Sequence, residues 1–233
     1  YCCYCYCGCD YTNYSQPCET YSKKLNKETD KEKRRKITII IKIKLIFFPD
    51  KKYSIIYADP PWQYKRNGGK SAESKYDVMS FEDIKNLKVN DIAEDNSHLY
   101  MWVTNPFISE GLEVCKSWGF EYKTLLTWVK TYKDGSPVMG MGYYFRGATE
   151  HIIFGVKGKK LCNNKNTKNI FYGTQRQHSQ KPNCVKDMIV KCSGDLPRIE
   201  LFAREETDGW DCWGNDTQKF NKNVMQKELI FNS

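Results

Sequence analysis

The sequence predicts an α/β fold, an open and mostly parallel sheet with helices on both faces. From about residue 37, short apolar runs alternate with amphipathic segments of helical period. The runs are mostly apolar, which is typical of strands that are buried on both faces. The 233 residues are also enough for one domain with a hydrophobic core.

Six segments predict strands, because they are short, apolar and rich in β-branched or aromatic residues. The second of them must end at Asp59-Pro60, since proline cannot donate a hydrogen bond to a sheet ladder. The predicted strands are 37–48, 53–58, 98–103, 120–129, 149–156 and 198–203.

Three helices lie between these strands. Ser80 and Asp83 resemble a capping box that opens a short helix. Asn105-Pro106 begins a second helix, which Gly119 ends, and the third covers 182–192. The expected buried faces of the two longer helices consist of Ile108, Leu112, Cys115 and Trp118, and of Val185, Met188, Ile189 and Cys192.

Composition divides the chain into three parts. Residues 1–36 combine alternating Tyr and Cys with a charge run, and we expect a low-complexity, disordered leader, with an artefactual origin as an open alternative. Six of the 11 cysteines lie there, but five of them are adjacent or at every other position, unlike the separate Cys-x₂₋₄-Cys pairs of structural zinc sites, so no metal site is expected. Residues 37–220 are expected to form the main domain and 221–233 a C-terminal tail.

The net charge of +9 is unevenly distributed, because residues 1–52 hold 12 Lys or Arg and 6 Asp or Glu. The rest of the chain is nearly balanced, so contacts with phosphate must come from local patches. The longest apolar run, 37–48, carries Lys42 and Lys44 and is too short to span a bilayer. The five scattered cysteines are typical of a reduced cytoplasmic protein.

Four polar residues stand where predicted strands end: Asp59, Thr104, Lys157 and Arg204. Ligands of open α/β sheets bind beyond the carboxyl ends of the strands. We therefore expect these four side chains to share one crevice.

The run Asp59-Pro60-Pro61-Trp62 combines a carboxylate, a rigid carbonyl and an aromatic ring. Asp59 and the carbonyl of Pro60 can each accept one hydrogen of an exocyclic amine on a heteroaromatic base, and the prolines lock the backbone. An aromatic ring nearby offers a stacking surface worth ~1–3 kcal/mol. The alternative interpretation is a strand that ends in a Pro-Pro turn, with Trp62 simply packed.

Together with further motifs, this run resembles the MT-A-seventy (MT-A70) family, the DPPW adenine-N6 methyltransferases of bacteria, phages and eukaryotes. The resemblance covers about residues 53–216 and keeps the order of the family. Its other motifs are HLYMWVT at 98–104, LTWVK at 126–130, Glu150-His151, GVKG at 155–158, SQKP at 179–182, RIELFAR at 198–204, Gly209-Trp210 and WGN at 213–215.

The resemblance implies a Rossmann-like methyltransferase fold with permuted motif order. It implies S-adenosyl-L-methionine as cofactor and adenine N6 in a nucleic acid as acceptor. We favour DNA, because a small domain without eukaryote-type extensions looks bacterial or viral; an RNA methyltransferase and a non-catalytic nucleic-acid-binding subunit are the alternatives. A cytoplasmic location in a bacterial or phage-infected cell, no membrane contact, and a homo- or hetero-oligomer are further expectations.

The resemblance also assigns residues. Catalysis is expected from Asp59, Pro60, Pro61 and Trp62, and Asp59 also serves the amino group of the cofactor. The lysine that matches Lys157 holds the carboxylate of the cofactor, and the sugar end is lined from Arg204 onward. The full set of expected cofactor-binding residues is Asp59, Lys157, Arg204, Glu206, Thr207 and Asn215. The acidic segment 204–207 differs from some relatives, which leaves the contacts of Glu206 and Thr207 open.

Two lysine-rich loops are the expected substrate contacts. Basic residues that alternate with aromatic residues suit a nucleic-acid strand whose target base is extruded. The alternative is that these lysines only solvate the loops. The expected contacts are Tyr64, Lys65, Arg66, Lys70, Lys75 and Tyr76 in the first loop and Lys159 and Lys160 in the second. The segment 139–144 with Arg146 is expected to form another wall of the site.

Overall fold

The computed structural model describes residues 48–63, 79–142, 144–159, 162–164, 166–174, 180–182 and 184–214. All of them belong to one compact unit, Phe48–Ser233. The predicted leader 1–36, the predicted strand 37–48 apart from Phe48, and the tail 221–233 lie outside the described residues. The domain boundaries at 37 and 220 therefore stay predictions.

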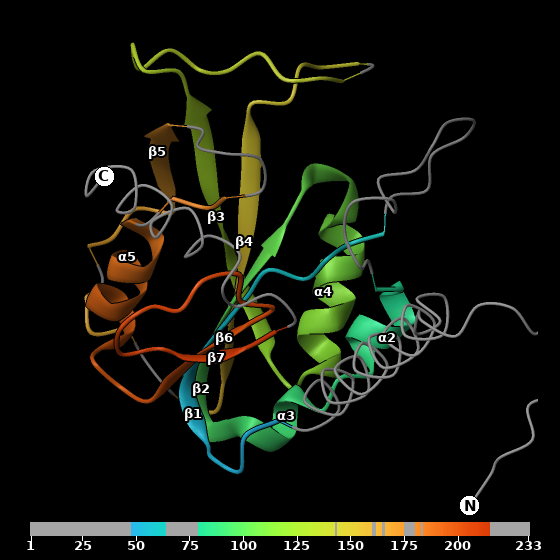
Figure 1. Ribbon diagram of the computed structural model, residues 1–233, viewed down its shortest axis with the longest axis vertical. Helices are drawn as coiled ribbons and strands as arrows, with labels where there is room; N and C mark the ends of the chain where they lie inside the picture. Colours follow the sequence, from blue (N-terminus) through green and yellow to red (C-terminus); the bar gives the residue numbers. More distant parts are fainter. Residues whose placement is uncertain are drawn as a thin grey trace, which may run out of the picture. The chain divides into compact units, whose positions relative to one another are not determined.

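The described strands form one seven-stranded sheet with the order β5-β3-β4-β2-β1-β6-β7 (Figure 1). Four neighbouring pairs are parallel, and β4 runs antiparallel to both β2 and β3. The expected mostly parallel α/β fold is thereby confirmed. The strands are β1 (Tyr53–Ala58), β2 (Ala93–Val103), β3 (Glu121–Thr131), β4 (Thr149–Lys157), β5 (Ile170–Thr174), β6 (Arg198–Leu201) and β7 (Asp211–Trp213).

Strand β1 lies near the centre of the sheet, between β2 and β6, and parallel to both. Its residues are almost completely buried, which explains why the segment is apolar throughout. Ala58 is in register with Met101 of β2 and Leu201 of β6. The three strands therefore end together, and the residues that follow them meet at one edge of the sheet.

Helices cover both faces of the sheet, as expected, and Figure 1 shows α4 and α5 on opposite sides. Helix α4 (Ile108–Ser117) follows a 3₁₀ turn, η2 (Asn105–Phe107), and packs closely because a Cβ on Gly111 would collide with Val103 and Ile153. On the other face, α5 (Cys184–Ser193) buries Val185 and Ile189 in the main core cluster. Two short helices, α2 (Phe81–Lys85) and α3 (Val89–Ile92), precede β2.

The local signals in the sequence are confirmed where the structure describes them. The Ser80 side chain accepts the backbone N–H of Asp83 at 3.1 Å and opens α2. Gly119, at a φ of 86°, follows the end of α4. The predicted buried face of α4 is correct for Cys115 and Trp118, which are buried. It is wrong for Ile108 and Leu112, which are partly exposed, whereas Gly111 and Val114 are buried.

The antiparallel direction of β4 corrects one expectation about the site. Lys157, the last residue of β4, pairs with Ser97, eight residues before the start of η2 along the chain. It therefore lies at the edge of the sheet opposite Asp59. The expectation that Lys157 shares a crevice with Asp59, Thr104 and Arg204 is wrong, because strands that run in opposite directions end at opposite edges.

Candidate active site

Asp59 lies directly after β1, and its backbone N–H donates to the carbonyl of Leu201 at 3.4 Å. The two prolines that follow stop the strand because they have no N–H to continue the ladder. The carbonyl of Pro60 accepts the N–H of Trp62 at 2.9 Å, so this turn is held by a hydrogen bond of its own. The Asp59 side chain is only 17% exposed.

The Asp59 side chain lies in the wall of a cavity of about 430 Å³ beyond the carboxyl ends of β1 and β6. Three other predicted residues line the same cavity: Arg204, Glu206 and Thr207. Aromatic rings of Tyr57 and Phe202 complete part of the wall. The cavity also contains charged residues for which the sequence predicted no role, namely Lys181, Lys186, Asp187, Glu200 and Glu205.

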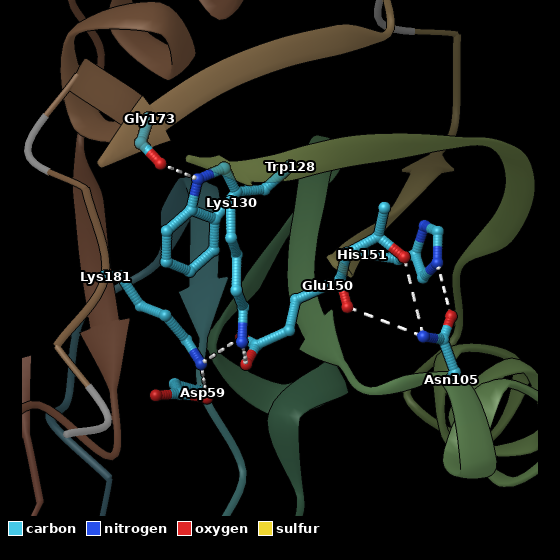
Figure 2. A network of polar contacts seen from close by, with 9 residues as sticks. Asp59, Asn105, Trp128, Lys130, Glu150, His151, Gly173 and Lys181 are labelled. Atoms are coloured by element: carbon cyan, nitrogen blue, oxygen red, sulfur yellow. Dashed lines mark hydrogen bonds and ion pairs between the residues drawn. The ribbon is translucent and has the colours of Figure 1, made fainter. Parts of the chain in front are cut away.

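Lys181 is the most important of these additions (Figure 2). Its Nζ lies 3.2 Å from Asp59 Oδ1 and 3.0 Å from Glu150 Oε2. Glu150 Oε1 in turn lies 2.6 Å from Nζ of Lys130. Positive and negative groups therefore alternate along Asp59, Lys181, Glu150 and Lys130, and Figure 2 shows the Lys181 side chain reaching down to both carboxylates.

The pKa values of Lys181 and Glu150 are both shifted in favour of their charged forms. Burial opposes charge on Lys181, but the carboxylates of Asp59 and Glu150 outweigh it and raise the pKa of Lys181 above its ordinary value. Burial likewise opposes charge on Glu150, but Lys181 and Lys130 hold the pKa of Glu150 below its ordinary value. The site therefore keeps a fixed cation beside Asp59 near neutral pH.

A second ion pair lies in the same cavity. Lys186 Nζ is 2.7 Å from Glu200 Oε2 and donates to Thr207 Oγ1 at 2.5 Å. Burial raises the pKa of Glu200, although Lys186 partly opposes this. A second cation bound in the cavity would therefore stabilise the ionised form of Glu200.

The Trp62 ring does not line the cavity. It stacks on Phe107, with ring centroids 5.5 Å apart and planes at 15°, and its Nε1 donates to the carbonyl of Trp102 at 3.1 Å. The Nε1 of Trp102 in turn donates to the hydroxyl of Tyr57 at 2.7 Å, which links Trp62 through Trp102 to β1. Trp62 thus fastens the turn that carries Asp59 to the neighbouring strand, which corresponds to the packed alternative of the sequence analysis.

Two further predicted residues that the structure describes, Lys157 and Lys159, lie away from the cavity. Lys157 Nζ donates to the carbonyls of Ala93, at 3.3 Å, and Asn90, at 3.5 Å. Lys159 follows it at the same far edge, where its N–H bonds the Asn96 side chain. The predicted residues that lie outside the described part of the chain are Tyr64, Lys65, Arg66, Lys70, Lys75, Tyr76, Lys160 and Asn215.

Lys181 lies in the SQKP motif, to which the sequence assigns no role. The resemblance assigns the carboxylate of the cofactor to the lysine of GVKG instead, which also stands at the end of a predicted strand. Glu150 and Lys130 also lie in motifs, EH and LTWVK, that predicted no role. Only their contacts show that they belong to the site.

Comparison with known proteins identifies the family of the chain. The family model MT-A70 matches residues 53–216, which include every element from β1 to β7. The chain belongs to the MT-A70 family. The resemblance expected from the motifs, including the methyltransferase class of enzyme, is thereby confirmed.

Relatives of this MT-A70 chain fall into two kinds. The type II methyltransferase M.MunI of a Mycoplasma species is 36% identical over 191 residues, which cover 71% of this chain and 78% of the relative. The human N(6)-adenosine-methyltransferase catalytic subunit METTL3 is 27% identical over 169 residues, which cover 70% of this chain but 28% of METTL3. A putative N(6)-adenosine-methyltransferase of Medicago truncatula is 27% identical, with 26% of its length covered. The chain thus spans about a quarter of these eukaryotic relatives.

Two further observations concern only the described residues. They contain no group of His, Cys, Asp and Glu side chains that could hold a metal ion. None of their helices is long and apolar enough to cross a membrane.

Proposed function

We propose that this MT-A70 chain transfers a methyl group from S-adenosyl-L-methionine to N6 of an adenine in DNA, and that the Asp59 cavity is its active site. The observation that carries this proposal is the position of the Asp59 carboxylate. It lies beside a proline-locked carbonyl, in the wall of a cavity at the carboxyl edge of the central strands.

The chemical difficulty is that the N6 lone pair of adenine is delocalised into the ring. The Asp59 carboxylate accepts one N6 hydrogen and the Pro60 carbonyl accepts the other, which orients the lone pair. The Pro60 carbonyl retains a lone pair for this purpose, because a carbonyl oxygen has two and Trp62 uses one. As the new N–C bond forms and the bond from the methyl carbon to the sulfonium sulfur breaks, positive charge would develop on N6 and strengthen both hydrogen bonds. The N6 proton that faces Asp59 would then pass to its carboxylate, which leaves the methylated amine neutral.

The residues of the cavity fit the cofactor that MT-A70 methyltransferases use. That group supplies an electrophilic methyl on a sulfonium, and it also carries an ammonium, a carboxylate and a ribose. Lys181 suits the carboxylate, because it is cationic and already faces the cavity. Asp59 and Glu200 suit the positive groups, and Arg204, Glu206 and Thr207 suit the hydroxyl groups of the sugar. The volume of about 430 Å³ lies within the range of small-molecule sites.

DNA is favoured over RNA because of the difference in sequence identity. The chain is 36% identical to the type II methyltransferase and 27% identical to the two relatives whose names specify adenosine, the ribonucleoside. A non-catalytic subunit would have no need of an acidic group and a lysine poised in a cavity. We also place the enzyme in the cytoplasm, where the free thiols of the five described cysteines would stay reduced.

The test is to incubate the chain with methyl-labelled cofactor and matched DNA and RNA oligonucleotides, and to identify the modified base. We expect N6-methyladenine in DNA. Asp59→Ala should lower kcat by at least about 100-fold, the usual cost of losing one acceptor or donor that acts in the transition state. Its circular dichroism should be unchanged.

Asp91→Ala is the matched control, because Asp91 is an exposed carboxylate of α3 at the far edge of the sheet. This variant should methylate at the wild-type rate. If Asp59→Ala labels adenine as fast as the control does, Asp59 is not the acceptor and the proposal fails.

A further inference from the structure

We infer that the segment joining β3 to β4, residues 132–148, is a wedge that enters duplex DNA when the target adenine leaves the base stack. The aromatic rings of Tyr144 and Phe145 form its point. This inference rests on the proposed function and adds to it the element that opens the duplex.

Exposed apolar side chains gather on this segment. Tyr144 and Phe145 are 96% and 91% exposed, and Met139 and Met141 are also largely exposed. Apolar groups this open to water usually mark an interaction site. Arg146 directly follows the two rings and is exposed as well.

The backbone of the segment is a narrow ribbon. At its base, Val138 donates to the carbonyl of Lys130 in β3 at 2.9 Å, and farther out Gly140 donates to the carbonyl of Gly147 on the returning half at 3.1 Å. A Cβ on Gly140 would collide with the Gly147 carbonyl oxygen, and one on Gly142 would collide with that of Phe145. The glycines therefore let the two halves approach closely, which leaves the rings of Tyr144 and Phe145 at the turn.

The wedge arises at the same edge of the sheet as Asp59. It begins directly after Lys130 and Thr131, and it ends directly before Thr149 and Glu150. Lys130 and Glu150 are members of the charged row that reaches Asp59 through Lys181. Figure 1 shows the segment extending past the ends of β3 and β4 at this edge.

A duplex substrate requires such an element. The Asp59 side chain is 17% exposed within its cavity, so an adenine that remains stacked and paired cannot bring N6 to it. Enzymes that act on a base extrude it and must offset the loss of stacking. Apolar side chains inserted between base steps are a common way to do so, and a neighbouring arginine can hold the phosphate. The two rings can stack on bases while the adjacent Arg146 contacts a phosphate, so this combination fits DNA better than it fits an apolar surface of another protein.

The test compares the double variant Tyr144→Ser/Phe145→Ser with the wild type on two substrates. One is a duplex that the wild type methylates, and the other is the same target strand alone. We expect kcat/KM on the duplex to fall at least about tenfold, because base stacking on aromatic rings is lost. On the single strand, which needs no extrusion, the change should be less than about twofold.

Two controls isolate the role of the rings. Tyr172→Ser removes an aromatic ring that is 64% exposed on β5, outside the wedge, and should leave both substrates unaffected. The exchange Tyr144→Phe/Phe145→Tyr keeps both rings and should keep the duplex activity. Loss of activity in the exchange variant would contradict a stacking role.

Equal losses of the double variant on duplex and single strand would overturn the inference and leave the proposed function intact. If light scattering also shows a wild-type dimer that the double variant cannot form, the rings belong to an interface between two copies of the chain. A wild type that methylates only RNA, or no oligonucleotide, would refute the proposed function and the wedge together.

Discussion

Replacing Lys181 with methionine removes the cation that separates Asp59 from Glu150. Its Nζ lies 3.2 Å and 3.0 Å from the two carboxylates, so each contact contributes an attraction of about 5 kcal/mol at an effective dielectric constant of about 20. Most of this offsets the desolvation of the three ions. Loss of one partner of a buried pair typically costs about 3–5 kcal/mol. Glu150 keeps Lys130, so we expect a loss near 3 kcal/mol.

The same substitution should weaken cofactor binding. A charge-assisted hydrogen bond contributes about 1.5–3 kcal/mol, which corresponds to a rise in the Kd for S-adenosyl-L-methionine of about 10- to 150-fold. The stability loss is measured by urea unfolding without ligand, and the Kd by calorimetry at a temperature where the variant is folded.

Lys157→Met is the matched control. Within the described part of the chain, Lys157 donates to two backbone carbonyls at the far edge of the sheet, and the family resemblance assigns this lysine to the cofactor. We expect a stability loss below about 1 kcal/mol and an unchanged Kd. If Lys157→Met weakens cofactor binding and Lys181→Met does not, the reasoning from the cavity is refuted.

Two further perturbations test the surroundings of Asp59. Trp62→Ala should cost about 3–5 kcal/mol in urea unfolding, because it removes a buried ring. At a temperature where it folds, methyl transfer should fall more than cofactor affinity, because the ring holds the turn that carries Asp59; equal losses would mean that the ring does not position this turn. Lowering the pH should destabilise the chain through Glu150. Its pKa in the folded state lies below the ordinary 4.5, so the unfolded state takes up a proton first and stability is lost as pH falls through that region. The slope between pH 5 and 4 should be smaller in Glu150→Gln, and an identical slope would contradict this account.

The sequence predicted elements well where the signal was local. The strand before Asp59-Pro60, the capping box of α2 and the end of α4 at Gly119 each depend on neighbouring residues, and the structure confirms them. The short strands β5 and β7 and the helix α3 were not predicted. They have only three to five residues each and are held by the pairing and packing of distant segments.

The candidate site was harder to predict, because it depends on strand direction. An apolar run such as 149–156 is equally apolar in either direction, so its sequence cannot tell which edge Lys157 will occupy. Because β4 is antiparallel to β2, its last residue, Lys157, lies far from Asp59, and Glu150, near its start, lies on the side of Asp59. The row from Asp59 to Lys130 joins three strands and a loop, and no spacing in the sequence encodes such contacts.

The sequence alone determined the fold class, the family and the Asp59-Pro60-Pro61-Trp62 turn, since periodicity, proline and motif order are properties of the chain itself. Only the tertiary structure decided which lysine stands beside Asp59, that Trp62 packs behind the turn, and that the rings of Tyr144 and Phe145 point into solvent. The physical reason is that charge pairing and burial depend on distances between residues far apart in the chain, and folding sets these distances.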